Sequence, residues 1–138
     1  MSERVTPGRC VFVAVMGAFV AAATTARGQE GIPAVPSGLV LTLQEVLEDP
    51  QPDGQLWLRL RYVAPDLAPD SYASVEEDFA VLCSEQALTY AGENALIASQ
   101  AVISIASAPV EFGSTAPDVT QFFEAFRLEN GACIWEAF

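Results

Sequence analysis

Residues 120–138 read TQFFEAFRLENGACIWEAF, and this stretch decides the fold because it contains a strong hairpin signal. The Asn130-Gly131 pair is typical of a two-residue turn in which both positions need a positive φ. Apolar and aromatic side chains flank the pair on both sides. The pattern predicts two antiparallel strands, over 121–128 and 133–138.

A two-residue turn also fixes the register, because Glu129 then lies opposite Ala132. Adjacent side chains point to opposite faces of a sheet, so the hairpin has an apolar face and a mixed face. We expect the apolar face in the core, and it carries Phe122, Phe126, Leu128, Cys133 and Trp135. The mixed face carries Phe123, Arg127, Glu129, Ile134, Glu136 and Phe138.

Three further strands are predicted upstream of this hairpin. Alternating runs at 39–47 and 56–63 are separated by the turn sequence PQPDG at 50–54, which predicts a second hairpin with a long loop. A short β-like run at 101–107 adds one more strand.

One helix is predicted between these strands. Ser74 followed by Glu77 is a capping-box pattern, and Gly92 is suited to end the helix. The buried stripe at helical spacing consists of Val75, Phe79, Leu82, Cys83, Gln86 and Tyr90. We therefore expect an α+β fold, with an antiparallel sheet of about five strands and one main helix packed on one face.

The N-terminus has the three parts of a secretory signal peptide. Two arginines precede an apolar run at 10–23, and small residues follow it. We predict a signal peptide over 1–28, cleaved after Gly28 or Ala26, and a single α+β domain over 29–138. The protein is then periplasmic or secreted, with no stable membrane span after cleavage. The alternative is an uncleaved membrane anchor.

The predicted mature chain keeps two cysteines, Cys83 and Cys133. An even number of cysteines in an exported protein favours a structural disulfide between them. The alternative is a redox-active thiol, which normally needs a C-x-x-C motif or a cationic neighbour. The sequence around these two cysteines has neither feature.

Charge excludes several classes of function. The 138 residues include 18 acidic side chains and six arginines but no lysine and no histidine. Without histidine, Ser-His-Asp triads, Cys-His pairs and histidine-ligated metal sites are excluded. Without lysine, a Schiff base and a P-loop are excluded. A net charge of −12 argues against nucleic-acid binding. The predicted mature chain has 17 acidic side chains and three arginines, which gives a net charge of −14. This charge either attracts a cationic partner or only keeps the protein surface well hydrated.

All three arginines of the mature chain are predicted to lie on one face of the sheet. If the leucines of 56–63 face the helix, the residues between them face away from it. The candidate interaction face consists of Trp57, Arg59, Arg61, Phe123, Arg127, Ile134 and Phe138. Aromatic residues and arginine are enriched at protein interfaces. The alternative is that the arginines pair with Glu129 and Glu136 beneath a loop at 108–120.

Other acidic clusters give weaker signals. The carboxylates at 74–78 suit a helix N-terminus, and those at 49–53 lack EF-hand spacing. We therefore predict no catalytic residue, no metal and no cofactor.

The segments PVEFG (109–113), TQFFEAFR (120–127) and NGACIWEAF (130–138), together with VLCSEQAL (81–88), resemble a family of short exported alphaproteobacterial proteins with a domain of unknown function. The resemblance covers most of the mature chain, including the Cys83/Cys133 pair. It implies an exported bacterial protein and brings no activity.

These features favour a non-enzymatic periplasmic or secreted binding module. Its partner is expected to be a protein, and the acidic surface favours a cationic one, for example a lysozyme that the chain inhibits. The first alternative is a structural envelope component that self-associates. The less favoured alternative is a hydrolase that uses only carboxylates, which would need a carboxyl group with a raised pKa in a pocket.

Overall fold

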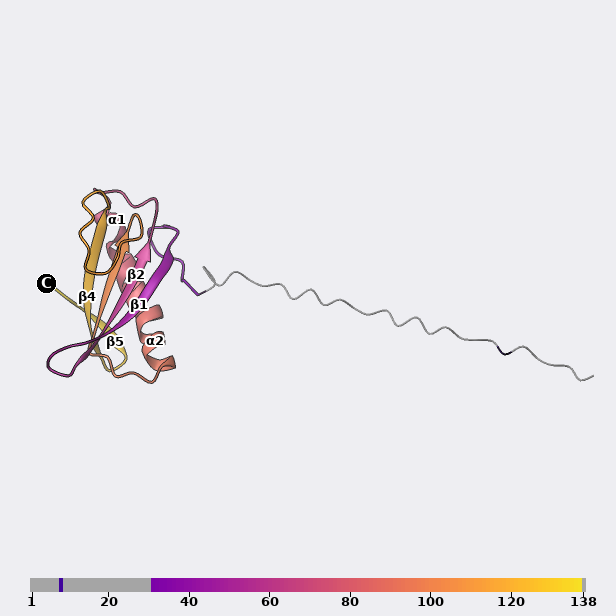
Figure 1. The fold of residues 1–138 in the computed structure, drawn as a ribbon, viewed down its shortest axis with the longest axis vertical. Coiled ribbons are helices and arrows are strands. Elements are labelled where there is room, and N and C mark those ends of the chain that lie inside the picture. Colours follow the sequence, from indigo (N-terminus) through magenta and orange to yellow (C-terminus); the bar gives the residue numbers. More distant parts are fainter. Residues whose placement is uncertain (1–7, 9–30, 138) are drawn as a thin grey trace, which may run out of the picture.

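The computed structural model describes residues 8 and 31–137 (Figure 1). The predicted signal peptide, apart from Gly8, and Phe138 of the candidate interaction face lie outside the described residues. The elements in chain order are β1 (Thr42–Pro50), β2 (Leu56–Val63), α1 (Tyr72–Leu82), the π-helical turn η1 (Cys83–Ala87), α2 (Leu88–Glu93), β3 (Gln100–Ala106), β4 (Gln121–Glu129) and β5 (Ala132–Glu136).

The five strands form one sheet in the order β1-β2-β3-β4-β5, which confirms the α+β class. Neighbouring strands are antiparallel except β2 and β3, which are parallel. The expectation of a wholly antiparallel sheet is therefore wrong. Two parallel neighbours need a crossover connection, and α1, η1 and α2 provide it between the end of β2 and the start of β3.

The C-terminal hairpin has the predicted register. Leu128 lies opposite Cys133, and Glu129 lies opposite Ala132. The φ values of Asn130 and Gly131 are 52° and 71°, so both turn residues adopt the left-handed conformation that the sequence predicts.

The first strand differs from its prediction at 39–47, because it runs from Thr42 to Pro50 and contains a bulge. Its register shifts between Leu43 and Glu45, which leaves Gln44 as an extra residue. A bulge reverses which alternate residues face each side of the sheet. Glu45 therefore faces the side opposite to Leu43.

The helix begins at Tyr72, with Ser71 at the N-cap position, so the predicted capping box at Ser74 is wrong. No side chain caps this end of the helix. The Ser71 hydroxyl instead donates to the Ala68 carbonyl at 2.6 Å and accepts from the Ala68 amide. The preceding turn thus uses the hydroxyl group that could have capped the helix.

The end of the helix also differs from the prediction at Gly92. The helix continues to Glu93, and Asn94 is its C-cap. The residue in the left-handed conformation after the helix is Ala95, with a φ of 52°. The Asn94 side chain donates to the Tyr90 carbonyl at 2.9 Å, which satisfies one carbonyl of the last turn.

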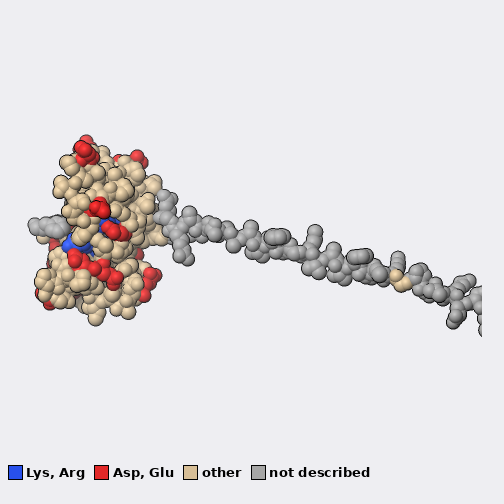
Figure 2. Space-filling view, in the orientation of Figure 1, with Lys and Arg blue, Asp and Glu red and all other residues tan. Residues whose placement is uncertain are grey.

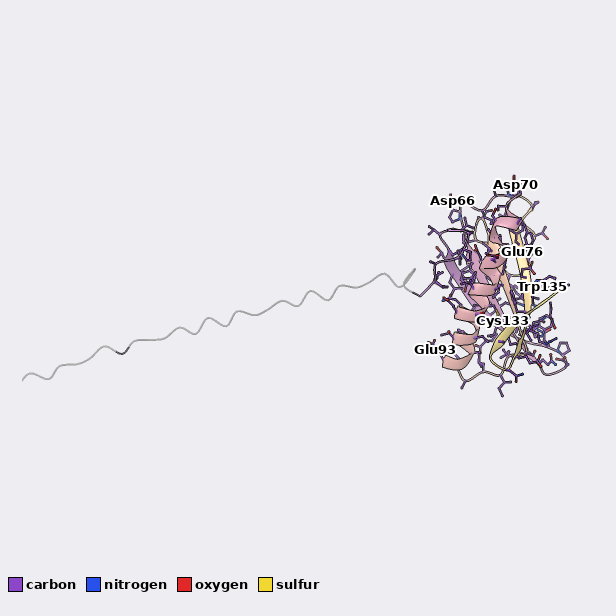
Figure 3. All side chains as sticks on the ribbon, turned by 180° about the vertical axis from the view of Figure 1, so that it is seen from behind. Asp66, Asp70, Glu76, Glu93, Cys133 and Trp135 are labelled. Carbon is purple, nitrogen blue, oxygen red and sulfur yellow. A yellow bond between two sulfur atoms is a disulfide. The ribbon has the colours of Figure 1, made fainter. Side chains whose placement is uncertain are left out.

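The core contains side chains from both the helix and the sheet. Figure 3 shows the helical segment in front of the sheet, on the side away from the viewer of Figure 1. The fully buried side chains of one cluster include Leu58, Leu60 and Tyr62 of β2, Ile103 and Ile105 of β3, and Val75, Phe79 and Leu82 of α1.

Trp135 is not part of this core, although its register position predicts it. It lies on the helix side of β5 at the edge of the sheet and remains 59% exposed. The same face of the hairpin buries Phe126 on β4, one strand further from the edge. Position within the sheet, in addition to facing direction, decides burial here.

Cys83 and Cys133 form a disulfide, as predicted, with their Cα atoms 6.3 Å apart. Cys83 is fully buried at the start of η1, and Cys133 lies on the edge strand β5. The bond therefore joins the middle of the helical segment to the last strand (Figure 3).

A buried carboxylate fixes the segment that precedes β1. Asp78 on α1 is fully buried, and it accepts hydrogen bonds from the Ser37 amide at 2.9 Å and from the Ser37 hydroxyl. Sequence analysis places Asp78 only among the carboxylates at 74–78 that suit a helix N-terminus, so this buried contact was not predicted. None of the helices in the described part of the chain has the length and apolar character needed to cross a membrane.

Removal of the disulfide is expected to destabilise the fold substantially. The bond closes a sequence separation of 50 residues, for which chain entropy predicts a loss of about 4 kcal/mol in the Cys83→Ser/Cys133→Ser double variant. Urea denaturation of both proteins measures the difference. Peptide mapping of the unreduced protein that finds both cysteines alkylated would contradict the bond itself.

Truncation of Asp78 is expected to lower the free energy of unfolding by about 2 kcal/mol, because Asp78→Ala removes the acceptor for both the amide and the hydroxyl hydrogen of Ser37. Glu77→Ala is the matched control, since Glu77 is the exposed neighbour on the same helix. We expect the control to change stability by less than about 0.5 kcal/mol. Equal effects of the two variants would exclude a special role for Asp78.

Candidate functional site

The described residues of the candidate interaction face form two rows across the sheet. In the first row, Trp57 pairs with Gln100, Gln100 with Arg127, and Arg127 with Ile134. In the second row, Arg61 of β2 pairs with Ser104 of β3, and Ser104 pairs with Phe123 of β4. Arg59 lies between the rows on the same face of β2. The structure thus brings together residues that are far apart in the sequence. Trp57 and Ile134, at the two ends of the first row, are separated by 77 positions.

Every arginine on this face is paired with a carboxylate. Figure 2 views this face and shows the arginine atoms near its middle with carboxylates beside them. Arg59 bonds Asp49 at 2.8 Å, and Arg61 bonds Glu45.

Arg127 makes the two ion pairs expected from the alternative interpretation, with Glu129 at 2.9 Å and with Glu136 at 3.1 Å. Glu45 and Asp49 are partners that sequence reasoning missed. The change in alternation after Leu43 is the signal that could have revealed them.

The Arg59–Asp49 hydrogen bond lowers the pKa of Asp49 below its ordinary value of 3.8. The carboxylate therefore stays ionised throughout the neutral range, and the pair stays charged on both sides. The same guanidinium lies 5.6 Å from the centre of the Trp57 ring, within cation–π distance. Trp57 is half-buried.

The loop at 107–120 covers part of the face and buries Arg61, which is 6% exposed. In Figure 1 this orange loop passes in front of the upper part of the sheet. Arg61 donates to the Val110 carbonyl at 2.7 Å, and Gln44 donates to the same carbonyl at 2.9 Å. The loop is also closed at its base, where Ser107 and Thr120 exchange two hydrogen bonds.

A pocket of about 270 Å³ lies between this loop and the sheet. Phe112 from the loop stands beside both arginines, with its ring centre 5.2 Å from Cζ of Arg59 and 5.6 Å from Cζ of Arg61. Other residues that line the pocket include Val102, Ser104, Val110, Glu111 and Phe123. The pocket therefore combines apolar walls with guanidinium groups.

A more open hollow of about 390 Å³ lies at the opposite end of the face, next to Trp57 and Arg127. Ile134 and Phe123 are 38% and 48% exposed, respectively. The face thus offers two hollows and exposed apolar side chains, while its arginines are held by carboxylates.

A second polar cluster, which sequence reasoning missed, lies on the helix side of the sheet. Glu124 of β4 is buried, and it accepts hydrogen bonds from the Tyr72 hydroxyl and from Nε1 of Trp135 at 2.5 Å. The alternation of β4 could have revealed it, because Glu124 lies between Phe122 and Phe126 on the core-facing side.

The Glu124 hydrogen bond raises the pKa of Tyr72 to about 12. Both carboxylate oxygens of Glu124 are used in holding α1 and β5 to β4, so this cluster stabilises the fold. Within residues 8 and 31–137, no group of three or more histidine, cysteine, aspartate or glutamate side chains could hold a metal ion.

Alkaline titration tests this cluster. The chain has three tyrosines, and the pKa of each is raised, that of Tyr62 by burial and that of Tyr90 by partial desolvation and Glu48. We expect the midpoint of each tyrosine to lie above pH 10, the ordinary value, in the folded protein. Because the folded pKa of Tyr72 is raised, its contribution to stability is complete below pH 10 and is lost as the pH rises through about 12.

The variant Glu124→Gln removes the negative charge and should bring the pKa of Tyr72 back toward 10, as measured by phenolate absorbance. Tyr72→Phe identifies which transition belongs to this residue. An unchanged titration in Glu124→Gln would show that Glu124 does not contact the Tyr72 hydroxyl in solution.

A family model described as a family of unknown function (DUF6497) matches residues 14–138, which include every described strand and helix. No curated protein and no solved structure matches the chain. The chain therefore belongs to this family of unknown function, which confirms the expected resemblance to a domain of unknown function.

Proposed function

We propose that the chain is an exported, non-enzymatic binding module that docks a basic protein on the candidate interaction face. Export is supported by the signal-peptide pattern at 1–28 and by the Cys83–Cys133 disulfide, since disulfides persist in oxidising compartments. We further infer that α1, η1 and α2 cover one face of the sheet. The opposite face is then left for a partner.

The observation that carries the proposal is the charge balance of this face. Three arginines lie there, and their surroundings hold five carboxylates, namely Glu45, Asp49, Glu111, Glu129 and Glu136. The face is thus negative overall although it contains every arginine of the described residues. A positively charged surface is its electrostatic complement, and such complementarity speeds association and selects partners.

Exposed apolar side chains supply the second part of an interface. Phe112 is 55% exposed, and Phe123 and Ile134 are also exposed. Burial of such side chains in the centre of an interface provides most of its binding energy, while charges at the rim provide orientation.

Charge disfavours the alternative of self-association through this face. Two copies of the predicted mature chain would each bring a net charge of −14, and two acidic faces would repel each other. The hydrolase alternative needs a carboxyl group whose pKa is raised by burial and which no structural contact occupies. Asp78 and Glu124 are the buried carboxylates of the described residues, and both accept hydrogen bonds that hold structural elements together.

The proposal is tested by binding to a lysozyme of strongly basic charge, with an acidic protein of similar size as the negative control. We expect binding only to the basic protein, and we expect its Kd to rise about tenfold between about 50 mM and about 300 mM NaCl as charges are screened. Biolayer interferometry measures both affinities.

The variant Phe123→Ser/Ile134→Ser should weaken this binding at least about fivefold, because it removes two exposed apolar side chains of the face. Ile97→Ser is the matched control, since Ile97 is exposed but lies in the connection before β3. Binding that both variants leave unchanged would show non-specific attraction to the acidic surface. Lack of binding to the basic protein at low salt would contradict the proposal.

A further inference from the structure

The pocket beneath the loop at 107–120 is held open by several independent contacts. The Val110 carbonyl accepts from two donors on different strands, Arg61 on β2 and Gln44 at the bulge of β1. The base of the loop is closed by Ser107 and Thr120. A pocket formed in this way exists before any ligand binds, so a ligand need not order the loop.

The two arginines that line the pocket differ in the donors that they leave available. Arg61 is buried, and its two terminal nitrogens bond Glu45 and Val110. Arg59 is half-buried and bonds Asp49 through Nε. Among the described residues, Nη1 and Nη2 of Arg59 have no hydrogen-bond partner, although the side chain lines the pocket.

A guanidinium edge of this kind has a preferred ligand. Two parallel N–H groups match the two oxygens of a carboxylate, and the resulting charge-assisted bonds are roughly twice as strong as neutral ones. Asp49 already occupies the Nε position of Arg59, so one carboxylate can be added at the free Nη edge.

The other residues that line the pocket determine which kind of group, attached to the carboxylate, can bind there. Val102, Val110, Phe112 and Phe123 are apolar, and the pocket volume of about 270 Å³ is near the small end of the range for ligand sites. A body of one ring or a short branched chain therefore fits better than an extended polar one. The exposed Glu111 side chain also lines the pocket, and its negative charge disfavours ligands with several negative charges.

We propose that this pocket binds a small monocarboxylic acid with an apolar body, with the carboxylate on the Nη edge of Arg59 and the body between Phe112 and Phe123. Arg61 acts as a positioning residue that holds the loop. Binding of such an acid does not require the basic protein partner proposed above. The same chemistry is presented by a free acid and by the C-terminal carboxylate of a peptide that ends in an apolar residue.

The test uses phenylacetate and its neutral analogue phenylacetamide as probes, with affinities measured by ligand-observed NMR. We expect phenylacetate to bind with a Kd on the order of 1 mM, as a ligand of its size can in a preformed pocket. Phenylacetamide should bind about tenfold more weakly because it lacks the negative charge.

Three variants locate the binding site. Arg59→Gln should weaken phenylacetate binding about tenfold while it keeps a donor for Asp49. Arg127→Gln is the matched control, because Arg127 is an ion-paired arginine of the same face outside the pocket, and it should leave the affinity unchanged. Glu111→Gln should tighten binding about twofold, since it removes a like charge at the pocket.

An acetylated dipeptide that ends in phenylalanine, with a free or an amidated C-terminus, distinguishes the two sources. Binding of the free acid form through Arg59 indicates a peptide terminus, whereas binding of phenylacetate alone indicates a free small acid. Either result supports the carboxylate site. The proposal would be overturned if phenylacetate and phenylacetamide bound equally well, if Arg59→Gln and Arg127→Gln lost the same affinity for phenylacetate, or if phenylacetate did not bind. None of these results bears on lysozyme binding.

Discussion

A buried guanidinium is the constraint on which the candidate interaction face depends. Arg61 is almost completely removed from water, and a charge in such a position is strongly destabilising unless it is paired and hydrogen-bonded. The Glu45 carboxylate supplies the charge, and the Val110 carbonyl supplies the remaining acceptor. One side chain on β2 therefore fixes both the strand beside it and the loop above it.

Glu45 is available to Arg61 only because β1 contains a bulge. Unbroken alternation would place Glu45 on the same side as Leu43, which packs against the core. The extra residue Gln44 places Glu45 on the opposite side of the sheet. The side-chain amide of Gln44 also donates to the Val110 carbonyl, which accepts from Arg61 as well. Asp49 moves to the arginine side together with Glu45. The bulge thus decides both the charge of the face and the position of the loop.

The parts of the fold that can be predicted from the sequence are those that depend on residues close together in the chain. The Asn130-Gly131 turn fixes its own register, and this register was sufficient to place Arg127 beside Ile134 and to turn Cys133 toward the helix. Pairing between strands that are distant in sequence has no such local signal. For this reason the parallel β2–β3 pair and the exposure of Trp135 at the sheet edge were not predicted. The site follows the same division. Its arginines and the Glu129 and Glu136 partners of Arg127 follow from strand alternation and the hairpin register, whereas the pairing of Glu45 and Asp49 with the arginines of β2 depends on contacts between strands.

Stability alone does not explain why the three arginines of the described residues share one face. Exposed ion pairs contribute little to folding, and the pairs of Arg59 and Arg127 are partly exposed. These pairs do, however, hold long side chains in fixed positions beside Trp57 and Ile134. Side chains that are ordered before a partner arrives lose less entropy on binding. The order that the ion pairs impose on these arginines is therefore what the proposed docking of a partner on this face would use.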